Sequence, residues 1–584
     1  MMCLSTLKSG VLRGPFFMAV ALACAAIAAP ALLPVGAPPL LSLYTEAIAL
    51  LCWGLWLAWL APRLGGLRLS AQLLTASPLA AALLVLLVSL ASVLLSVAAL
   101  GLPGVIGVRH TVILCAAVLA LLAGARLAGL SATLQGQALS HAALLGFLVA
   151  GLGSAAIAVA QYFAVDGPWE RLGKDGRAGG NLAQPNLLGT QLLWAYAALV
   201  ALRARQRLGR TMAWLGAALL LLAVAMSASR SAALGCLVLA LWGALDRRLS
   251  RETRGLLMAA PVALMVAWGL LTLWPQVGGP GFAGTGLLHK ADPTSSRWRL
   301  WQQCARLIAE HPWAGVGWGQ FNFAWSLTPM PGLPRTVGYT FSHAHNIVLQ
   351  WAVELGLPLA LLLVGVLGFA LLRTAQRLWR RSGDSPADQR AALAMVLVVI
   401  LHSQFEFPLW HTNFLLPAVF LLGLAVGSVG DVAVPVGPSR NASAAPLLLA
   451  LAAAWALLDY RPIAAVYLPP ADAAPLAQRI ATAQQSWLFG QFADRFAGTL
   501  AKPGARALDV YTGAAFELVD LRLLASWAQA LAEHGQIDKA RFLAARLAEF
   551  ESPPAKLFFA PCQAHPEGFQ CSANAQHYGF ANFR

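Results

Sequence analysis

The chain has 584 residues, of which 59% are hydrophobic and only 11% are charged, and its mean hydropathy is +0.68. Such a composition leaves too little polar surface to cover a soluble protein of this length, so it predicts an all-α polytopic membrane protein. The formal net charge is +16, but no basic-aromatic module of a nucleic-acid-binding protein accompanies it, and we expect no nucleic-acid partner.

Thirteen apolar runs are long enough to cross a bilayer. They lie near residues 14–34, 40–61, 72–100, 108–125, 141–163, 186–202, 211–226, 231–245, 255–274, 346–372, 391–405, 411–429 and 444–459. The first run resembles a signal peptide, but the twelve spans that follow favour an uncleaved first helix. Residues 1–459 are therefore predicted to form a transmembrane domain of about thirteen helices.

The basic residues predict which loops stay in the cytoplasm. They gather in the N-terminal segment and in alternate short loops at residues 63–68, 203–210, 247–254 and 373–381. Because short arginine-rich loops are retained in the cytoplasm, residues 164–185, residues 275–345 and the chain after about residue 460 are expected on the other side. Most of the net charge is then a topology signal.

Residues 460–584 lose the long apolar runs and predict a small helical domain outside the membrane. Amphipathic helices are expected at 475–499, 506–534 and 536–551, with a turn before the last of them. Cys562 and Cys571 lie close together in this region. Outside the cytoplasm they could form a short-loop disulfide, and two free thiols are the alternative.

The stretch "SHAHN" at residues 342–346 places two histidines at the start of a predicted membrane helix. If Ser342 caps that helix, His345 falls in its first turn, where the positive end of the helix dipole keeps an imidazole neutral and suited to act as a general base. His343 would point about 200° away and be accessory. One alternative is that the histidines and Asn346 are ordinary caps at the membrane interface. Another is an H-x-H metal site, although no third ligand stands at a recognisable spacing. Glu354 is too deep in the predicted helix to orient His345.

Arginines mark two further places on the expected non-cytoplasmic side. Arg230 stands at the outer end of a predicted span, against the charge bias of the other short loops. Arg297 and Arg299 begin a segment with an apolar stripe of two tryptophans, which suits the membrane interface. Each arginine could contact a lipid phosphate loosely or bind a diphosphate by bidentate hydrogen bonds.

Amides and a second histidine cluster complete the polar set. Asn181, Gln184 and Asn186 precede or begin a predicted span, where they serve either as caps or as partners of sugar hydroxyls. Glu406 and His411 lie in a short outward turn, and Glu406 at a membrane boundary requires a cationic partner. Arginines, a histidine base, amides and tryptophans together suit glycosyl transfer from a lipid diphosphate.

The combination of "SHAHN", "SASRSAALG" and "SSRWRLW…HPWAGVGWGQF" resembles the O-antigen ligase and polymerase superfamily of bacterial inner membranes. "NLAQPNLLG", "HSQFEFPLWH" and the C-terminal extension are more similar to its protein O-oligosaccharyltransferase branch, which glycosylates pilins and other periplasmic proteins. The resemblance implies a multi-pass inner-membrane protein whose loop at 275–345, active site and C-terminal domain face the periplasm.

The resemblance assigns the essential histidine to His345, the diphosphate-binding arginines to Arg230 and Arg297, and the family's glutamine to Gln184. Related sequences often have tyrosine where this chain has Phe407, so the phenol is lost here, and either His411 replaces it or it is dispensable.

The implied reaction transfers an oligosaccharide en bloc from undecaprenyl diphosphate to serine or threonine hydroxyls of a periplasmic protein or pilin. It needs neither a cofactor nor a metal, and its other partner is the membrane lipid. The alternatives are ligation of O-antigen to lipid A core or glycan polymerisation. A polytopic transporter or flippase is a further alternative, but polar residues that crowd one face favour chemistry at the surface.

Overall fold

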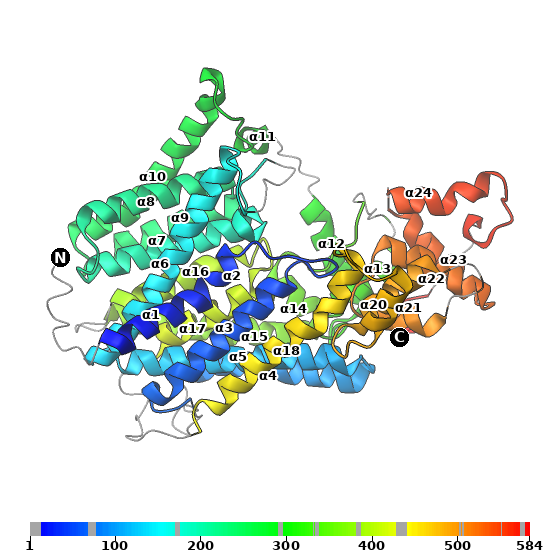
Figure 1. Cartoon of the computed structure of the whole chain (residues 1–584), viewed down its shortest axis with the longest axis horizontal. Helices are drawn as coiled ribbons and strands as arrows, with labels where there is room; N and C mark the ends of the chain where they lie inside the picture. Colours follow the sequence, from blue (N-terminus) through cyan, green and yellow to red (C-terminus); the bar gives the residue numbers. More distant parts are fainter. Residues whose placement is uncertain are drawn as a thin grey trace.

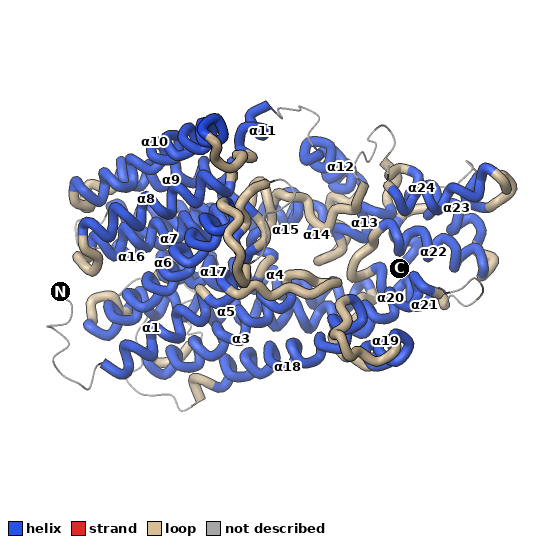
Figure 2. Tube along the Cα trace, turned by 45° about the horizontal axis from the view of Figure 1, so that its top comes forward, coloured by secondary structure: helices blue, strands red, loops and turns tan. Residues whose placement is uncertain are grey.

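A computed structural model describes residues 13–67, 77–169, 176–289, 296–330, 332, 338–380, 387–427, 441–501, 504, 507–550, 552–572 and 578–584. Within these ranges the regular structure is helical and contains no strand (Figure 2). The N-terminal segment up to residue 12 and the basic positions 68 and 381 lie outside them. An all-helical fold follows from the composition, because a chain in lipid must satisfy its backbone polar groups within each segment.

The apolar runs of the sequence form the helices of the bundle. These are α1 (Arg13–Ile27), α2 (Ala29–Leu32), α3 (Leu43–Leu60), α4 (Pro78–Leu100), α5 (Gly104–Gly129), α6 (Leu134–Tyr162), α7 (Pro185–Ala204), α8 (Arg210–Ser227), α9 (Arg230–Leu245), α10 (Arg251–Leu273), α15 (Leu357–Arg380), α16 (Ala387–His402), α17 (Thr412–Val426) and α18 (Ala444–Tyr467). In the described part of the chain nine are long and apolar enough to cross a membrane, namely α3 to α8, α10, α15 and α18. Shorter helices occupy the other predicted spans, and the chain is a polytopic membrane protein.

One predicted span, 346–372, is divided in the structure. It forms the short helix α14 (Ile347–Leu355) and then α15, with a break at Gly356. Gly356 has a φ of 79°, and a Cβ there would lie 2.4 Å from the carbonyl oxygen of Trp313. The chain before α13 packs so closely against this break that only glycine fits. A single continuous span is therefore wrong at this position, and α14 lies before the membrane-spanning helix α15.

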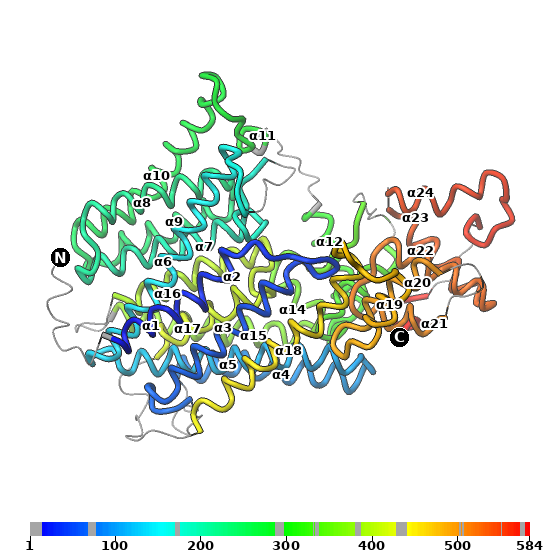
Figure 3. The backbone as a smooth tube through the Cα atoms, in the orientation of Figure 1, coloured from blue at the N-terminus to red at the C-terminus, as the bar shows by residue number. Residues whose placement is uncertain are grey.

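Short helices follow α10 in the chain, and the first of them stays beside α10. They are α11 (Gly284–His289), α12 (Ser296–Glu310), α13 (Phe321–Leu327) and α14. Figure 1 shows α12, α13 and α14 at the end of the bundle that faces the C-terminal helices, and Figure 3 shows the chain continuing from α18 into that region. This junction carries the polar residues of the predicted site.

The C-terminal region is a set of short helices that shares a hydrophobic core with the junction. The helices are α19 (Leu476–Gln484), α20 (Gly490–Leu500), α21 (Leu508–Ala515), α22 (Leu521–Glu533), α23 (Ile537–Ala548) and α24 (Pro553–Phe559). The predicted helices 475–499 and 506–534 are each divided in two, because buried side chains such as Phe489 and Val519 turn inward between the halves. Trp325 of α13 and Trp527 of α22 belong to the same core. The boundary at residue 460 between two domains stays a prediction.

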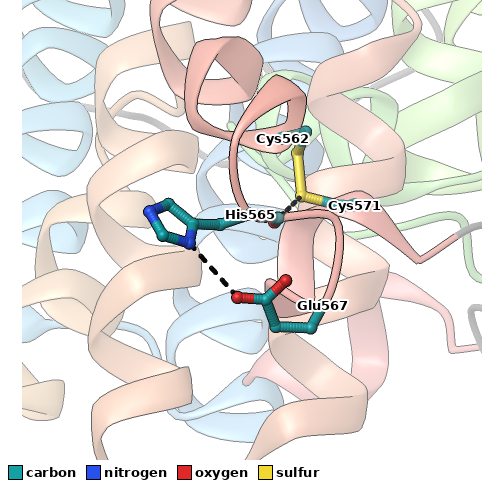
Figure 4. Close-up of a disulfide and its surroundings, with 4 residues drawn as sticks. All are labelled: Cys562, His565, Glu567 and Cys571. Atoms are coloured by element: carbon teal, nitrogen blue, oxygen red, sulfur yellow. Dashed lines mark hydrogen bonds and ion pairs between the residues drawn. A yellow bond between two sulfur atoms is a disulfide. The ribbon is translucent and has the colours of Figure 1, made fainter.

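Cys562 and Cys571 are joined by a disulfide near the C-terminus (Figure 4). The structure thus selects the first of the two alternatives for this pair. His565 lies inside the closed loop, and its carbonyl oxygen is 3.5 Å from the disulfide-bonded Sγ of Cys571.

Replacing both cysteines by serine is expected to destabilise the C-terminal helices by about 2–3 kcal/mol, because an open loop gains conformational entropy in the unfolded state. Thermal unfolding of the purified protein, monitored by limited proteolysis of the chain after residue 550, measures this loss of stability. A protein whose Cys562 and Cys571 are both alkylated without reductant would contradict the bond.

Candidate active site

His345 lies in the turn that leads into α14. Its φ of 53° places it in the left-handed region, which residues other than glycine rarely adopt. Asn346 is the N-cap of α14, since its Oδ1 accepts from two backbone N–H groups of the first turn, both at 3.0 Å. Ser342 instead hydrogen-bonds His343 Nδ1 at 2.9 Å. The prediction that Ser342 caps the helix and places His345 in its first turn is therefore wrong, and His345 directly precedes the cap.

The carboxylate of Glu406 holds the His345 ring. His345 Nδ1 and Glu406 Oε2 are 2.8 Å apart, and the Arg297 guanidinium pairs with Oε1 of the same carboxylate. Burial raises the pKa of Glu406, but the hydrogen bond from His345 and the charge of Arg297 outweigh it and hold that pKa below its ordinary value. The prediction that Glu406 pairs with one of the arginines is confirmed.

This pairing determines which nitrogen of His345 can act as a base. Because Glu406 stays ionised, it can only accept, so Nδ1 of His345 carries the proton and donates it to the carboxylate. Nε2 is then left with a free lone pair. His345 and Glu406 line a small pocket together with Phe407 and Trp410, and the His345 side chain is 20% exposed there. The imidazole is therefore oriented as a general base would be.

A second layer of hydrogen bonds extends from Glu406 toward α7 and α9. Asn186 donates to Glu406 Oε1 at 3.0 Å, and its own Oδ1 accepts from Ser229 Oγ at 2.8 Å and from Arg177 at 3.2 Å. Ser229 caps α9, whose first residue is Arg230. Arg230 is exposed, and the described residues offer it no ion pair. Arg297, in contrast, is already paired with Glu406.

The backbone of Ala344, next to His345, is held on both sides. Its N–H donates to Gln350 Oε1 at 2.7 Å, and its carbonyl oxygen accepts from the indole N–H of Trp301 at 3.0 Å. Trp301 lies on α12, the helix that also carries Arg297. These two bonds fix the unusual backbone conformation at His345 relative to both α12 and α14.

Glu354, unexplained by the sequence, orients the Gln350 amide. Glu354 is 2% exposed, and its Oε1 accepts from Gln350 Nε2 at 2.9 Å and from the backbone N–H of Phe321 at 3.2 Å. Because the carboxylate attracts the NH₂ end of Gln350, the oxygen end must face Ala344. Glu354 therefore acts on His345 through Gln350, four residues earlier on the same helix.

His343 and His411 both contact the ring of Phe407. The His343 ring stacks on Phe407 with centroids 4.3 Å apart, and His411 lies 5.6 Å from the same ring. His411 Nδ1 is 3.2 Å from an oxygen of Glu46 on α3. His411 is thus paired with Glu46 and not with Glu406. A phenol role for His411 stays a prediction.

The remaining predicted residues have structural partners. Gln184 is the N-cap of α7, where its Oε1 accepts from Leu187 N at 2.5 Å, and Asn181 donates to the carbonyl oxygen of Leu32 at 2.6 Å. Arg299 is half-buried in the first turn of α12. The predicted interfacial stripe of α12 is partly accessible, since Trp298 is 54% exposed while the opposite face packs on the C-terminal helices.

Sequence reasoning missed Arg177, Glu46 and Gln350. Arg177 stands in a loop that the sequence predicts to be non-cytoplasmic, against the charge bias, and that bias is a signal that could have identified it. Glu46 and Gln350 carried no such signal, because their partners are distant or backbone atoms. Among the described residues, no three His, Cys, Asp or Glu side chains gather so as to hold a metal ion. Metal-independent transfer stays a prediction.

Fold and site together define a polytopic membrane protein with a histidine–glutamate pair and arginines at one end of its bundle. Residues 215–364 match the O-antigen ligase family, and residues 390–553 match the C-terminal part of the virulence factor membrane-bound polymerase family. The chain therefore belongs to the superfamily of O-antigen ligases and O-oligosaccharyltransferases.

Two proteins of Acinetobacter baylyi (strain ATCC 33305 / BD413 / ADP1) are similar to the chain. A general O-oligosaccharyltransferase is 28% identical over 285 residues, which cover 47% of this chain and 48% of that protein. A ComP-specific O-oligosaccharyltransferase is 25% identical over 252 residues, which cover 43% of this chain and 44% of that protein. The chain thus spans about half the length of the curated relatives it matches.

Proposed function

We propose that this protein transfers an oligosaccharide from an undecaprenyl-diphosphate carrier to serine or threonine hydroxyls of proteins, such as pilins, on the periplasmic side of the bacterial inner membrane. The observation that carries the proposal is the 2.8 Å contact between His345 Nδ1 and Glu406, whose carboxylate also binds Arg297. Similarity to two O-oligosaccharyltransferases supports the same reaction class.

In the proposed reaction the acceptor hydroxyl oxygen forms a bond to the anomeric carbon of the glycan. The bond from that carbon to the diphosphate oxygen breaks, and the lipid diphosphate leaves with the electron pair. Nε2 of His345 takes the hydroxyl proton, while Glu406 stabilises the imidazolium that forms. Arg230 and Arg297 stabilise the negative charge of the departing diphosphate, and no metal or cofactor takes part.

A protein acceptor is supported by the C-terminal helices, which lie beside the site and offer a surface for docking. Val519, between α21 and α22, accepts hydrogen bonds from Thr340 at 2.7 Å and from Asn322 at 3.3 Å. The segment that leads to His345 is thus tied to the region that would receive the protein. A sugar acceptor has no evident use for this surface.

Deleting the gene from its host tests the proposal. We expect at least one periplasmic protein to lose a glycan mass, measured by intact-protein mass spectrometry, while the lipopolysaccharide ladder on a gel stays unchanged. A changed ladder with unchanged proteins would indicate a ligase or polymerase. If the purified protein cannot glycosylate an acceptor when given a lipid-linked glycan, the result would favour a transporter or flippase over a transferase.

A further inference from the structure

A large cavity adjoins the small pocket at His345. Its volume is about 640 Å³, and its walls are mostly apolar side chains of α3, α4, α5, α15, α17 and α18. Ile347, Ser403, Leu409 and Trp410 line both the cavity and the pocket. Arg177, Arg230 and Arg297 do not line the cavity. The described arginine that does line it is Arg109, which pairs with Glu517. The pocket at His345 therefore adjoins a cavity from whose lining Arg177, Arg230 and Arg297 are absent.

Part of the cavity wall is a polar and aromatic patch made of Glu46, His110, Trp318 and Trp410. Glu46 accepts from His411 at 3.2 Å and from Thr412 at 3.4 Å, and Trp410 precedes these two residues in the chain. The rings of Trp410 and Trp318 are nearly parallel, with centroids 6.5 Å apart and an angle of 12°. The His110 ring packs edge-on against Trp318 at the end of this patch, with ring centroids 6.4 Å apart.

This patch carries polar groups that are available to bind a ligand. The indole N–H groups of Trp318 and Trp410 have no partner in the described part of the chain, and the Glu46 carboxylate remains 22% exposed. Flat aromatic faces bind the C–H faces of a pyranose, and a carboxylate and indole N–H groups bind its hydroxyls. A lipid chain would use the apolar walls and leave these groups unsatisfied.

We infer that Glu46, Trp318 and Trp410 form a carbohydrate subsite, which binds a sugar ring of the lipid-linked glycan in the cavity next to the pocket of His345. The assignment rests on the proposed function. It places the sugar next to the pocket of the base, so that the anomeric carbon lies beside His345.

The test uses the full-length protein in detergent and two variants, Trp318→Leu and Glu46→Gln. Trp455→Leu is the matched control, because Trp455 lines the same cavity but packs against Trp487 at an interplanar angle of 32° and is not part of the patch. Binding of the methyl glycosides of glucose, galactose and N-acetylglucosamine is measured by saturation-transfer NMR. We expect the wild type to bind at least one glycoside and both variants to bind it about fivefold more weakly, with the control unchanged.

Binding and transfer are scored separately, so the two proposals can fail independently. Glycoside binding that depends on Trp318 and Glu46 supports the subsite even if the protein transfers no glycan. Transfer by the wild type together with unchanged glycoside binding and unchanged donor KM in both variants overturns the subsite. A polyprenyl phosphate without sugar that loses affinity in both variants would also overturn it, since the cavity would then be a lipid site.

Discussion

Replacing His345 by alanine is expected to reduce glycan transfer by about 10³-fold, because the substitution removes the imidazole that Glu406 orients as a base. Glu406→Gln should reduce the rate by at least about 10²-fold, since a neutral amide neither fixes the tautomer of His345 nor stabilises the imidazolium. The measurement is the initial rate of transfer by purified protein at saturating donor, with membrane insertion checked by fractionation.

His565→Ala is the matched control for this experiment. His565 is an exposed histidine in the loop closed by the disulfide, with a side chain 73% accessible, and its variant should retain the wild-type rate. A wild-type rate in His345→Ala would remove His345 from the mechanism. Equal loss of transfer and of folded protein in the membrane would instead indicate a structural role.

The second large effect is expected at Gln350, the residue that holds the backbone next to His345. Gln350→Glu places a carboxylate opposite Glu354, so the two groups repel and the bond to Ala344 is disturbed. A displacement of about 1 Å at a catalytic group can cost roughly 10²-fold in rate, and we expect a loss of that order in kcat with little change in KM.

A swap of the two side chains tests this positioning directly. In Gln350→Glu/Glu354→Gln the new carboxylate again accepts from Ala344 and no longer faces a second carboxylate. Gln350 and Phe321 both bind Oε1 of Glu354, so the amide at position 354 of the double variant can serve only one of them. The double variant should therefore recover part of the rate lost in Gln350→Glu, and Glu354→Gln alone, whose amide oxygen can accept from both partners, should approach the wild-type rate. A merely structural need for a charge at Glu354 predicts the reverse, with Glu354→Gln impaired and no rescue by the swap.

The pH dependence of stability supplies an independent readout for Glu354. Burial raises the pKa of this carboxyl to about 7, above its ordinary value, despite the hydrogen bonds from Phe321 and Gln350. A raised pKa means that ionisation weakens the folded state as pH rises from about 4.5 toward 7. Glu354→Gln does not titrate, so its melting temperature relative to the wild type should rise across this interval.

The class of protein and much of the candidate site follow from the residue types and apolar patterns along the chain. Every predicted span contains a helix, because long apolar runs can satisfy their backbone groups in lipid only as helices. His345, Glu406 and Arg297 were each identified from residue types that are costly at a membrane boundary unless they have partners. The resemblance to O-oligosaccharyltransferases depended on the same short stretches, and the comparisons with known proteins confirm it.

Only the tertiary structure decided how these residues combine. Glu406 lies 61 positions after His345, and their contact depends on how the turn after α16 lies against the start of α14, where Ile347 N–H donates to the Ser403 carbonyl oxygen. The break at Gly356 likewise reflects a contact with Trp313, which local periodicity does not encode. The roles of Glu354 and Gln350 depend on a single backbone N–H, that of Ala344. Apolar patterns report each segment's preference for lipid, whereas hydrogen-bond partners are selected by the folded chain as a whole.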